Sequence, residues 1–142
     1  MENFGSDPVK KHDVRILLAE DNETNKELIL IMLEKMGYRA EAVSNGEEAV
    51  EALKSFSYDL LVMDIHMPEM DGFQATRIIR DKNSGVLNHD IPIIALTGDS
   101  EEEDRETCLK VGMDEHICKP INTKLLKDTI GQFLRERKGL NK

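Results

Sequence analysis

The sequence predicts an α/β domain in which helices cover both faces of a parallel sheet. Short apolar segments alternate with longer amphipathic segments along nearly the whole chain, giving five β/α units. Connections of this length cannot be hairpin turns, so the strands should pair in parallel through right-handed crossovers. The 142 residues fit one domain of ordinary size. We therefore expect a doubly wound, three-layer (βα)5 fold with no attached catalytic or DNA-binding module.

The first two units are predicted within residues 14–55. Residues 14–19 form a strand-like run, and residues 38–43 form a second, weaker strand. The helix between them should end at Gly37, and the next helix should begin at Asn45. The apolar residues of the two helices recur at helical spacing: Leu28, Ile29, Met32, Leu33 and Met36 in the first, and Ala49, Val50 and Leu53 in the second.

The third strand, residues 58–63, is almost wholly apolar, which is typical of a strand covered on both faces. Pro68 and Gly72 then mark a turn, and residues 81–90 form a polar loop. Pro92 belongs at the beginning of the fourth strand, because proline cannot donate to a strand ladder. The remaining elements are expected at residues 73–80 (helix), 91–96 (strand), 101–111 (helix ended by Gly112), 115–118 (strand) and 123–137 (helix).

The composition describes a folded, acidic domain. Apolar residues make up 39% of the chain, enough for a core, so the 33% of charged residues should form the surface. The 28 acidic and 19 basic residues give a net charge of −9. Because nucleic acids and anionic membranes attract basic surfaces, we expect neither as a partner.

The ends of the chain and its cysteines favour a cytoplasmic, reducing location. Residues 1–12 lack periodicity and are expected to be a disordered linker or cloning remainder, followed by a domain over 13–138 and a tail over 139–142. No apolar run approaches a membrane span, and no signal peptide is evident. Cys108 and Cys118 lack the spacing of a disulfide framework or zinc site, and are interpreted as small core or surface residues.

Functional side chains follow the predicted strands at the points where they end. Glu20 and Asp21 follow the first strand, and Asp64, Thr97 and Lys119 end the third, fourth and fifth. In the flavodoxin-like strand order 2-1-3-4-5 the first and third strands are neighbours, so the three carboxylates should converge. Their repulsion favours a bound cation, and hard oxygen ligands suit Mg²⁺. A hydroxyl and an ammonium nearby would suit the oxygens of a phosphoryl group.

Each of these residues also has a simpler interpretation. Asp21 or Asn22 could cap the following helix, although capping cannot explain Asp64, which Pro68 separates from the next helix. A single strand-ending threonine such as Thr97 is commonly an ordinary strand residue or a turn former, and a single lysine such as Lys119 is commonly a surface residue. The functional interpretation therefore depends on the joint placement of the set.

Four short motifs follow one another along the chain: residues 18–22 (LAEDN), 62–72 (VMDIHMPEMDG), 95–98 (ALTG) and 118–120 (CKP). In combination and order they resemble the receiver domains of response regulators in two-component signalling. The resemblance covers about residues 13–137 and is greatest to receivers carried within hybrid sensor histidine kinases. The chain is then either such a domain excised from a kinase or a stand-alone regulator.

The resemblance implies a phosphoacceptor site. Asp64 would take a phosphoryl group from a phosphohistidine and become an aspartyl phosphate. Mg²⁺, or Mn²⁺ as an alternative, would be held by Asp21, Asp64 and the backbone carbonyl of His66, with Glu20 acting through water. Lys119 would contact the phosphoryl oxygens.

The resemblance also implies a switch. Thr97 would hydrogen-bond a phosphoryl oxygen, and a ring at the position of His116 would rotate inward. Tyrosine or phenylalanine is more usual there, so an exposed histidine without a switching role is the alternative. In the family the lysine–proline bond is usually cis, which supports a cis peptide between Lys119 and Pro120.

Three residues beside the nucleophile are expected to tune the site. His66 and Asp99 lie two positions after Asp64 and Thr97, where family members adjust how long the phosphate lasts. Gly98 should keep access to the phosphate open, or else serve as a flexible turn.

The implied partners are a histidine kinase or a histidine phosphotransfer domain, which would meet the first helix and the Pro68 and Lys119 loops. A homodimer through the fourth and fifth helices is a further expectation. No membrane contact is expected of this domain, although a full-length protein could tether it to a membrane-bound sensor kinase.

The resemblance implies that the chain would catalyse its own phosphorylation and dephosphorylation without being a turnover enzyme. Two other functions are alternatives to this interpretation. A phosphohydrolase of the haloacid dehalogenase type also uses an Asp after a parallel strand and Mg²⁺, but needs a second Asp where this chain has His66. A non-phosphorylated adaptor with the same fold would be expected to have lost part of the acidic set, Thr97 or Lys119, and none is lost.

Overall fold

A computed structural model describes residues 13–98 and 102–138, and in them the predicted doubly wound fold is confirmed. Five parallel strands pair in the order β2-β1-β3-β4-β5. The segments interpreted as a linker (1–12) and a tail (139–142) lie outside the described residues. The strands are β1 (Arg15–Ala19), β2 (Arg39–Val43), β3 (Leu60–Asp64), β4 (Ile93–Thr97) and β5 (Glu115–Cys118).

Five helices connect and follow these strands. Each predicted element is present, with bounds that differ from the expected ones by at most two residues. None of the described helices combines the length and the apolar character that a membrane crossing requires. The helices are α1 (Glu23–Lys35), α2 (Gly46–Ser55), α3 (Gly72–Arg80), α4 (Glu102–Val111) and α5 (Thr123–Lys138).

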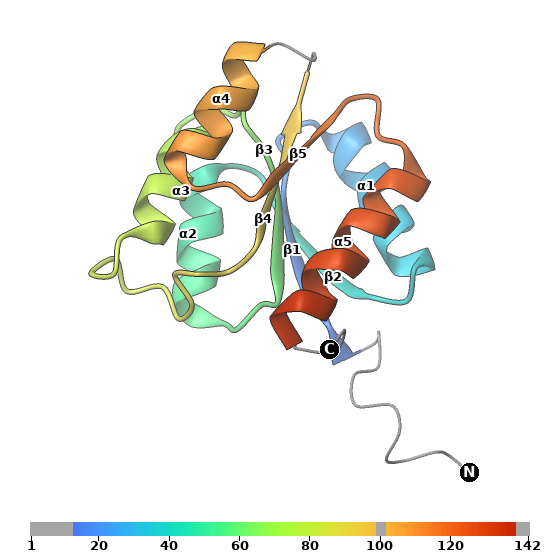
Figure 1. Cartoon of the computed structure of the whole chain (residues 1–142), viewed down its shortest axis with the longest axis horizontal. Helices are drawn as coiled ribbons and strands as arrows, with labels where there is room; N and C mark the ends of the chain where they lie inside the picture. The colour runs from blue at the N-terminus through green and yellow to red at the C-terminus, as the bar shows by residue number, and fades with distance from the viewer. Residues whose placement is uncertain (1–12, 99–101, 139–142) are drawn as a thin grey trace.

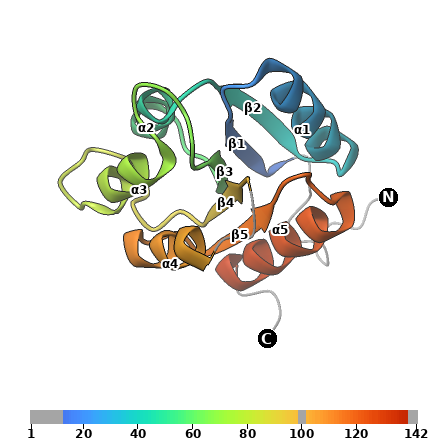
Figure 2. The same cartoon turned by 90° about the horizontal axis from the view of Figure 1, so that it is seen from above.

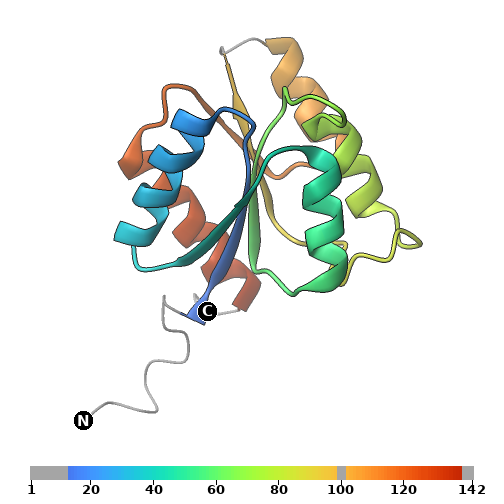
Figure 3. The same ribbon diagram turned by 180° about the vertical axis from the view of Figure 1, so that it is seen from behind.

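The helices form two layers around the sheet. Helices α1 and α5 cover one face, and α2, α3 and α4 cover the other (Figures 1 and 3). Side chains alternate along each strand between these layers, so that Leu17 packs beneath α2 and α3 while Ile16 and Leu18 pack beneath α1 and α5. Strand β3 is buried at every residue, as its apolar run predicts.

Local signals fix where the helices begin and end. The side chain of Asn45 caps α2 by accepting a hydrogen bond from the backbone of Glu48. Asp71 and Gln74 form a reciprocal capping box at α3. Gly37 and Gly112 end α1 and α4 with φ of 99° and 109°, which residues with a Cβ rarely adopt.

The apolar face of α1 is narrower than its sequence pattern predicts. Ile29, Leu33 and Met36 are buried against the sheet, and Met32 is partly buried. Leu28 was expected on the same face, but half of its surface is exposed. The sheet contacts only one stripe of the helix, and Leu28 instead lines a surface pocket beside the last strand.

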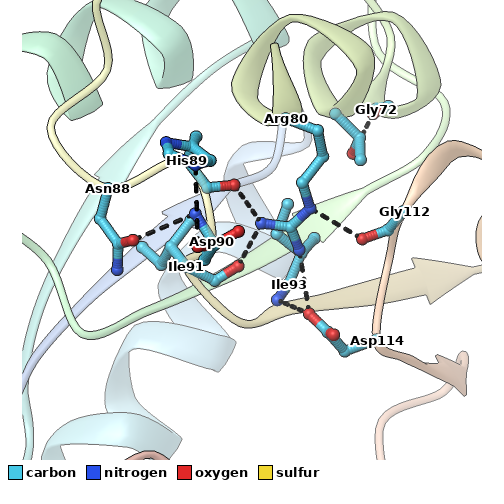
Figure 4. A network of polar contacts seen from close by, with 10 residues as sticks. Gly72, Arg80, Asn88, His89, Asp90, Ile91, Ile93, Gly112 and Asp114 are labelled. Atoms are coloured by element: carbon cyan, nitrogen blue, oxygen red, sulfur yellow. Dashed lines mark hydrogen bonds and ion pairs between the residues drawn. The ribbon is translucent and has the colours of Figure 1, made fainter. Parts of the chain in front are cut away.

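Arg80, the last residue of α3, contacts the segments that precede β4 and β5 (Figure 4). Its guanidinium donates to the backbone carbonyls of His89, Ile91 and Gly112 at 2.8, 2.7 and 3.0 Å. It also forms an ion pair of 3.0 Å with Asp114. The five donors of a guanidinium suit this task, because they are fixed in one plane.

Replacing Arg80 should destabilise the fold. Arg80→Met should lower the free energy of unfolding by about 2–4 kcal/mol, because the carbonyls and Asp114 lose a charged donor. Arg77→Met is the matched control, since Arg77 is exposed on the same helix, and it should stay within about 0.5 kcal/mol of the wild type. Urea denaturation measures both, and equal losses would contradict a structural role for the Arg80 contacts.

Candidate functional site

The strand order brings the predicted site residues to one edge of the sheet. Strands β1 and β3 are neighbours, with Ala19 opposite Met63, so the residues that follow them in the chain emerge side by side. Figure 2 views the molecule from this carboxyl edge. Ligands of doubly wound sheets bind at this edge, beside the strand where the order reverses.

Three carboxylates form the centre of the site. Oxygen atoms of Glu20, Asp21 and Asp64 all lie within 4.8 Å of one another. Glu20 is fully buried and Asp64 is 4% exposed, whereas Asp21 is open to solvent. The convergence expected from the strand order is therefore present in the folded chain.

Asn22, and not Asp21, caps the first helix. The Asn22 side chain accepts a hydrogen bond of 2.9 Å from the backbone of Asn25. The capping interpretation therefore does not account for the carboxylate of Asp21, which stands at the mouth of the acidic cluster.

The carboxylate of Glu20 is buried, and a nearby cation would stabilise its charge. Its Oε2 accepts a hydrogen bond from the backbone of Asn22 at 3.1 Å. Its Oε1 lies 3.3 Å from Nζ of Lys119, within ion-pair distance, but makes no hydrogen bond. Among the described residues, this is the one buried side-chain nitrogen or oxygen without a hydrogen-bond partner. Burial raises the pKa of Glu20 above its ordinary 4.5; the Asn22 hydrogen bond opposes this, and the charge of Asp64 adds to it. A hard divalent cation nearby would offset the negative charge of the carboxylates and provide an interaction for Oε1, the oxygen without a hydrogen bond.

Lys119 reaches across the site from the end of β5. Its Nζ donates to Oδ2 of Asp64 at 2.8 Å. Burial alone would lower the pKa of Lys119, but the hydrogen bond to Asp64 and the charges of Asp64 and Glu20 hold it above its ordinary value. The side chain is therefore a cation at the carboxylate expected to be the nucleophile. The Lys119–Pro120 peptide bond is cis.

The backbone around Asp64 fixes the position of its carboxylate. Oδ1 accepts a hydrogen bond from the backbone of His66 at 3.1 Å, while the His66 side chain is exposed. Gly72, at the start of α3, packs directly against the end of β3. A Cβ there would lie 2.6 Å from the carbonyl oxygen of Asp64, so only glycine fits. From the sequence, Gly72 was expected to mark a turn and to end the motif over residues 62–72, and its close packing against β3 was not predicted.

Thr97 is buried at the end of β4, with 1% of its surface exposed. Its hydroxyl donates to Sγ of Cys118 at 3.5 Å. Cys118 was interpreted as a small residue without a role, and only its position next to Lys119 could have suggested otherwise. The contact depends on the pairing of β4 with β5, which places the two residues opposite each other.

The structure describes His116 and Gly98, two further residues expected to switch or tune the site. His116 lies opposite Ala95 and is partly exposed, with Nδ1 3.7 Å from a carboxylate oxygen of Glu115. A Cβ at Gly98 would meet no described atom within 4 Å, so packing there does not require glycine. Asp99 lies outside the described residues.

The site thus offers ligands for a hard divalent cation and a positive charge for an anion. Its carboxylates offer oxygen ligands, and Lys119 offers a positive charge next to Asp64. Together these groups suit a phosphoryl group transferred to a carboxylate, a reaction that needs positioning and charge neutralisation.

The chain belongs to the family of response regulator receiver domains, whose model matches residues 16–131. It is 43% identical over 117 residues to hybrid signal transduction histidine kinase B of Dictyostelium discoideum, covering 77% of this chain and 6% of the kinase. It is 38% identical over 148 residues to probable histidine kinase 1 of Oryza sativa subsp. indica, covering 84% of this chain and 15% of that protein. The chain therefore spans only a small part of each kinase.

Solved receiver structures share the fold. One is the receiver domain of sensor histidine kinase PA1611 from Pseudomonas aeruginosa, with a magnesium ion in its active site cleft; it has a TM-score of 0.77 and 38% identity, covering 85% of this chain and 97% of that one. Another is in a co-crystal of the Saccharomyces cerevisiae phosphotransfer protein Ypd1 with the receiver domain of Ssk1, with a TM-score of 0.78 and 28% identity, covering 84% and 88%.

The burial of Glu20 predicts a pH-dependent cost to stability. The folded pKa of Glu20 lies above the unfolded value of 4.5, so the folded chain still holds the carboxyl proton at pH values where the unfolded chain has lost it. The free energy of unfolding therefore falls as the pH rises from the unfolded pKa through the folded pKa. Without divalent cations at neutral pH, Glu20→Gln should therefore unfold at a higher temperature than the wild type. The difference should shrink below the unfolded pKa.

The matched control is Glu27→Gln, because Glu27 is exposed on α1. Thermal unfolding in EDTA across this pH range measures both variants. A destabilised Glu20→Gln at neutral pH would show that ionisation of the buried carboxylate does not lower the stability of the fold.

Proposed function

We propose that this chain is a phosphoacceptor domain in which Asp64 takes a phosphoryl group from a phosphohistidine. The observation that carries the proposal is the Asp64 carboxylate, 2.8 Å from the Lys119 ammonium and beside two further acids. An oxygen of Asp64 forms the new P–O bond while the N–P bond breaks. The imidazole leaves with the bonding electron pair, as a neutral ring when its other nitrogen carries a proton.

Asp21 and Asp64 would hold Mg²⁺ directly, with the carbonyl of His66 as a further ligand and Glu20 acting through water. The ion would supply neutralising charge for the phosphoryl oxygens. The orphaned Oε1 of Glu20 and the bound magnesium of the PA1611 receiver support this assignment. Mn²⁺ has the same preference for oxygen ligands and is the natural substitute.

Within the site, Lys119 would neutralise the phosphoryl oxygens, and Thr97 would donate its hydroxyl to one of them. Movement of Thr97 would open space beside β5, into which the ring of His116 could turn. His116 lies two residues before Cys118 in β5, so the alternation of side chains along a strand puts both on the same face of the sheet. His66 and Asp99 remain the proposed residues that set the lifetime of the phosphate.

A histidine kinase or phosphotransfer domain would approach over α1. A pocket of 330 Å³ opens beside Lys119 and Pro120, and apolar Leu28 and Ile29 line its α1 side. An apolar helix carrying the phosphohistidine could cover these residues and present its ring to Asp64. The face formed by α4, β5 and α5 would remain for an output partner or a second copy.

The resemblance to hybrid kinases suggests that the domain acts within a phosphorelay, with the kinase in the same protein or in another. If the kinase is a membrane-bound sensor, the domain would work on its cytoplasmic side. The domain would signal by being phosphorylated and contacted, and would turn over no external substrate.

Asp64 should be the site of phosphorylation. Incubation with acetyl phosphate and Mg²⁺ should add one phosphoryl group in the wild type and none in Asp64→Asn, because the amide is not a nucleophile. Asp90→Asn is the matched control, since Asp90 is exposed in a distant loop, and it should react as the wild type. Intact-mass spectrometry measures the product. A wild type that remains unmodified with every phosphodonor would overturn the proposed function.

Mg²⁺ should stabilise the folded protein through the acidic cluster. At a free concentration of 100 times its Kd, the gain should be about 2.7 kcal/mol. Asp21→Asn and Asp64→Asn should lose most of it, because each removes a charged ligand. Glu23→Gln, an exposed acid two residues beyond Asp21, should keep it. Thermal unfolding in EDTA and in Mg²⁺ gives the comparison, and a full gain in Asp21→Asn would place the ion elsewhere.

A further inference from the structure

The hydroxyl of Thr97 contacts a residue of the neighbouring strand β5. It donates to Sγ of Cys118 at 3.5 Å, and the two residues are directly opposite in the parallel register of β4 and β5. Thr97 is almost completely buried, whereas Cys118 is half-buried. Among the described residues, no hydrogen bond joins the Thr97 hydroxyl to Asp64. The hydroxyl expected to meet the phosphoryl group is therefore hydrogen-bonded to a cysteine.

Both carboxylate oxygens of Asp64 already have donors. Oδ2 accepts from Lys119 at 2.8 Å, and Oδ1 accepts from the backbone of His66 at 3.1 Å. A buried hydroxyl without any acceptor is unfavourable. The Cys118 sulfur gives Thr97 an acceptor while Asp64 keeps its own donors.

Sulfur is a weak hydrogen-bond acceptor, whereas a phosphoryl oxygen carries charge and accepts strongly. The contact between Thr97 and Cys118 can therefore orient the hydroxyl and still be replaced by a contact to phosphate. The strength of this contact enters directly into the balance between the two orientations of Thr97.

We propose that Cys118 is a positioning residue that holds Thr97 in the orientation seen in the structure and so sets how readily the domain switches. The effect on switching rests on the proposed phosphorylation of Asp64. The orientation of Thr97 itself does not. Removing the acceptor should shift Thr97 toward the phosphoryl-binding orientation, and retaining an acceptor should preserve the present one.

Cys118→Ala and Cys118→Ser form a matched pair, because they differ only in the presence of a hydroxyl acceptor. The side-chain rotamer of Thr97 can be measured by nuclear magnetic resonance, from three-bond couplings and the methyl shift of labelled threonine, without any phosphodonor. We expect one dominant rotamer in the wild type and in Cys118→Ser, and a second populated rotamer in Cys118→Ala. Equal rotamer populations in all three proteins would overturn the proposal.

The consequence for switching can be measured with beryllium trifluoride and Mg²⁺, a phosphoryl analogue that binds carboxylates. Cys118→Ala should bind it about two- to tenfold more tightly than the wild type, the range that one net hydrogen bond contributes, and Cys118→Ser should stay within about twofold. In a Thr97→Val background the substitution Cys118→Ala should have no such effect, because the hydroxyl is gone.

Each outcome bears on one of the two ideas. Equal affinities in Cys118→Ala and Cys118→Ser, or a gain that persists with Thr97→Val, would overturn the role of Cys118 in switching. Failure of every variant to bind beryllium trifluoride would count against the function proposed for Asp64. The rotamer measurement would still decide whether Cys118 positions Thr97.

Discussion

The close approach of three carboxylates at one edge of the sheet is the constraint on which the rest of the site depends. Glu20, Asp21 and Asp64 come together because β1 and β3 are neighbours and both end at this edge. Burial makes the negative charge of Glu20 costly and raises its pKa, and the charge of Asp64 adds to this cost. Lys119 relieves part of this cost. The unfavourable electrostatics of the cluster and its suitability for a cation and a phosphoryl group have the same origin.

The site combines firmly held and weakly held parts. Asp64 is fixed by tight backbone packing at Gly72 and by two hydrogen bonds to its carboxylate. Farther from the site, Arg80 ties the turns at the opposite end of the sheet to α3. Thr97, in contrast, is held by one contact to sulfur. Under the proposed function, a phosphoryl group would meet a fixed acceptor and a hydroxyl that can change its partner, a division of roles that suits a two-state switch.

The pattern of apolar segments predicted a doubly wound parallel sheet and each of its elements, because most elements have a clear period and end signal. It was less accurate about α1, where Leu28 proved to be exposed, since periodicity marks an apolar face without showing how much of it the sheet can cover. It also left open whether Asp21 or Asn22 caps that helix, because both residue types do so. The hydrogen bond from Asn25 decides for Asn22.

The sequence by itself determined the fold class, the family and the set of acidic residues, threonine and lysine at the strand ends. These features can be read from the order of residues along the chain, because the periodicity of each segment and the residue at each strand end are local properties of the sequence. Only the tertiary structure decided the contacts between residues far apart in sequence: the 2.8 Å pair of Lys119 with Asp64, the orphaned oxygen of Glu20, and the contact of Thr97 with Cys118. Such contacts depend on strand register and on side-chain direction to within an ångström, and these are set by the packing of the whole sheet.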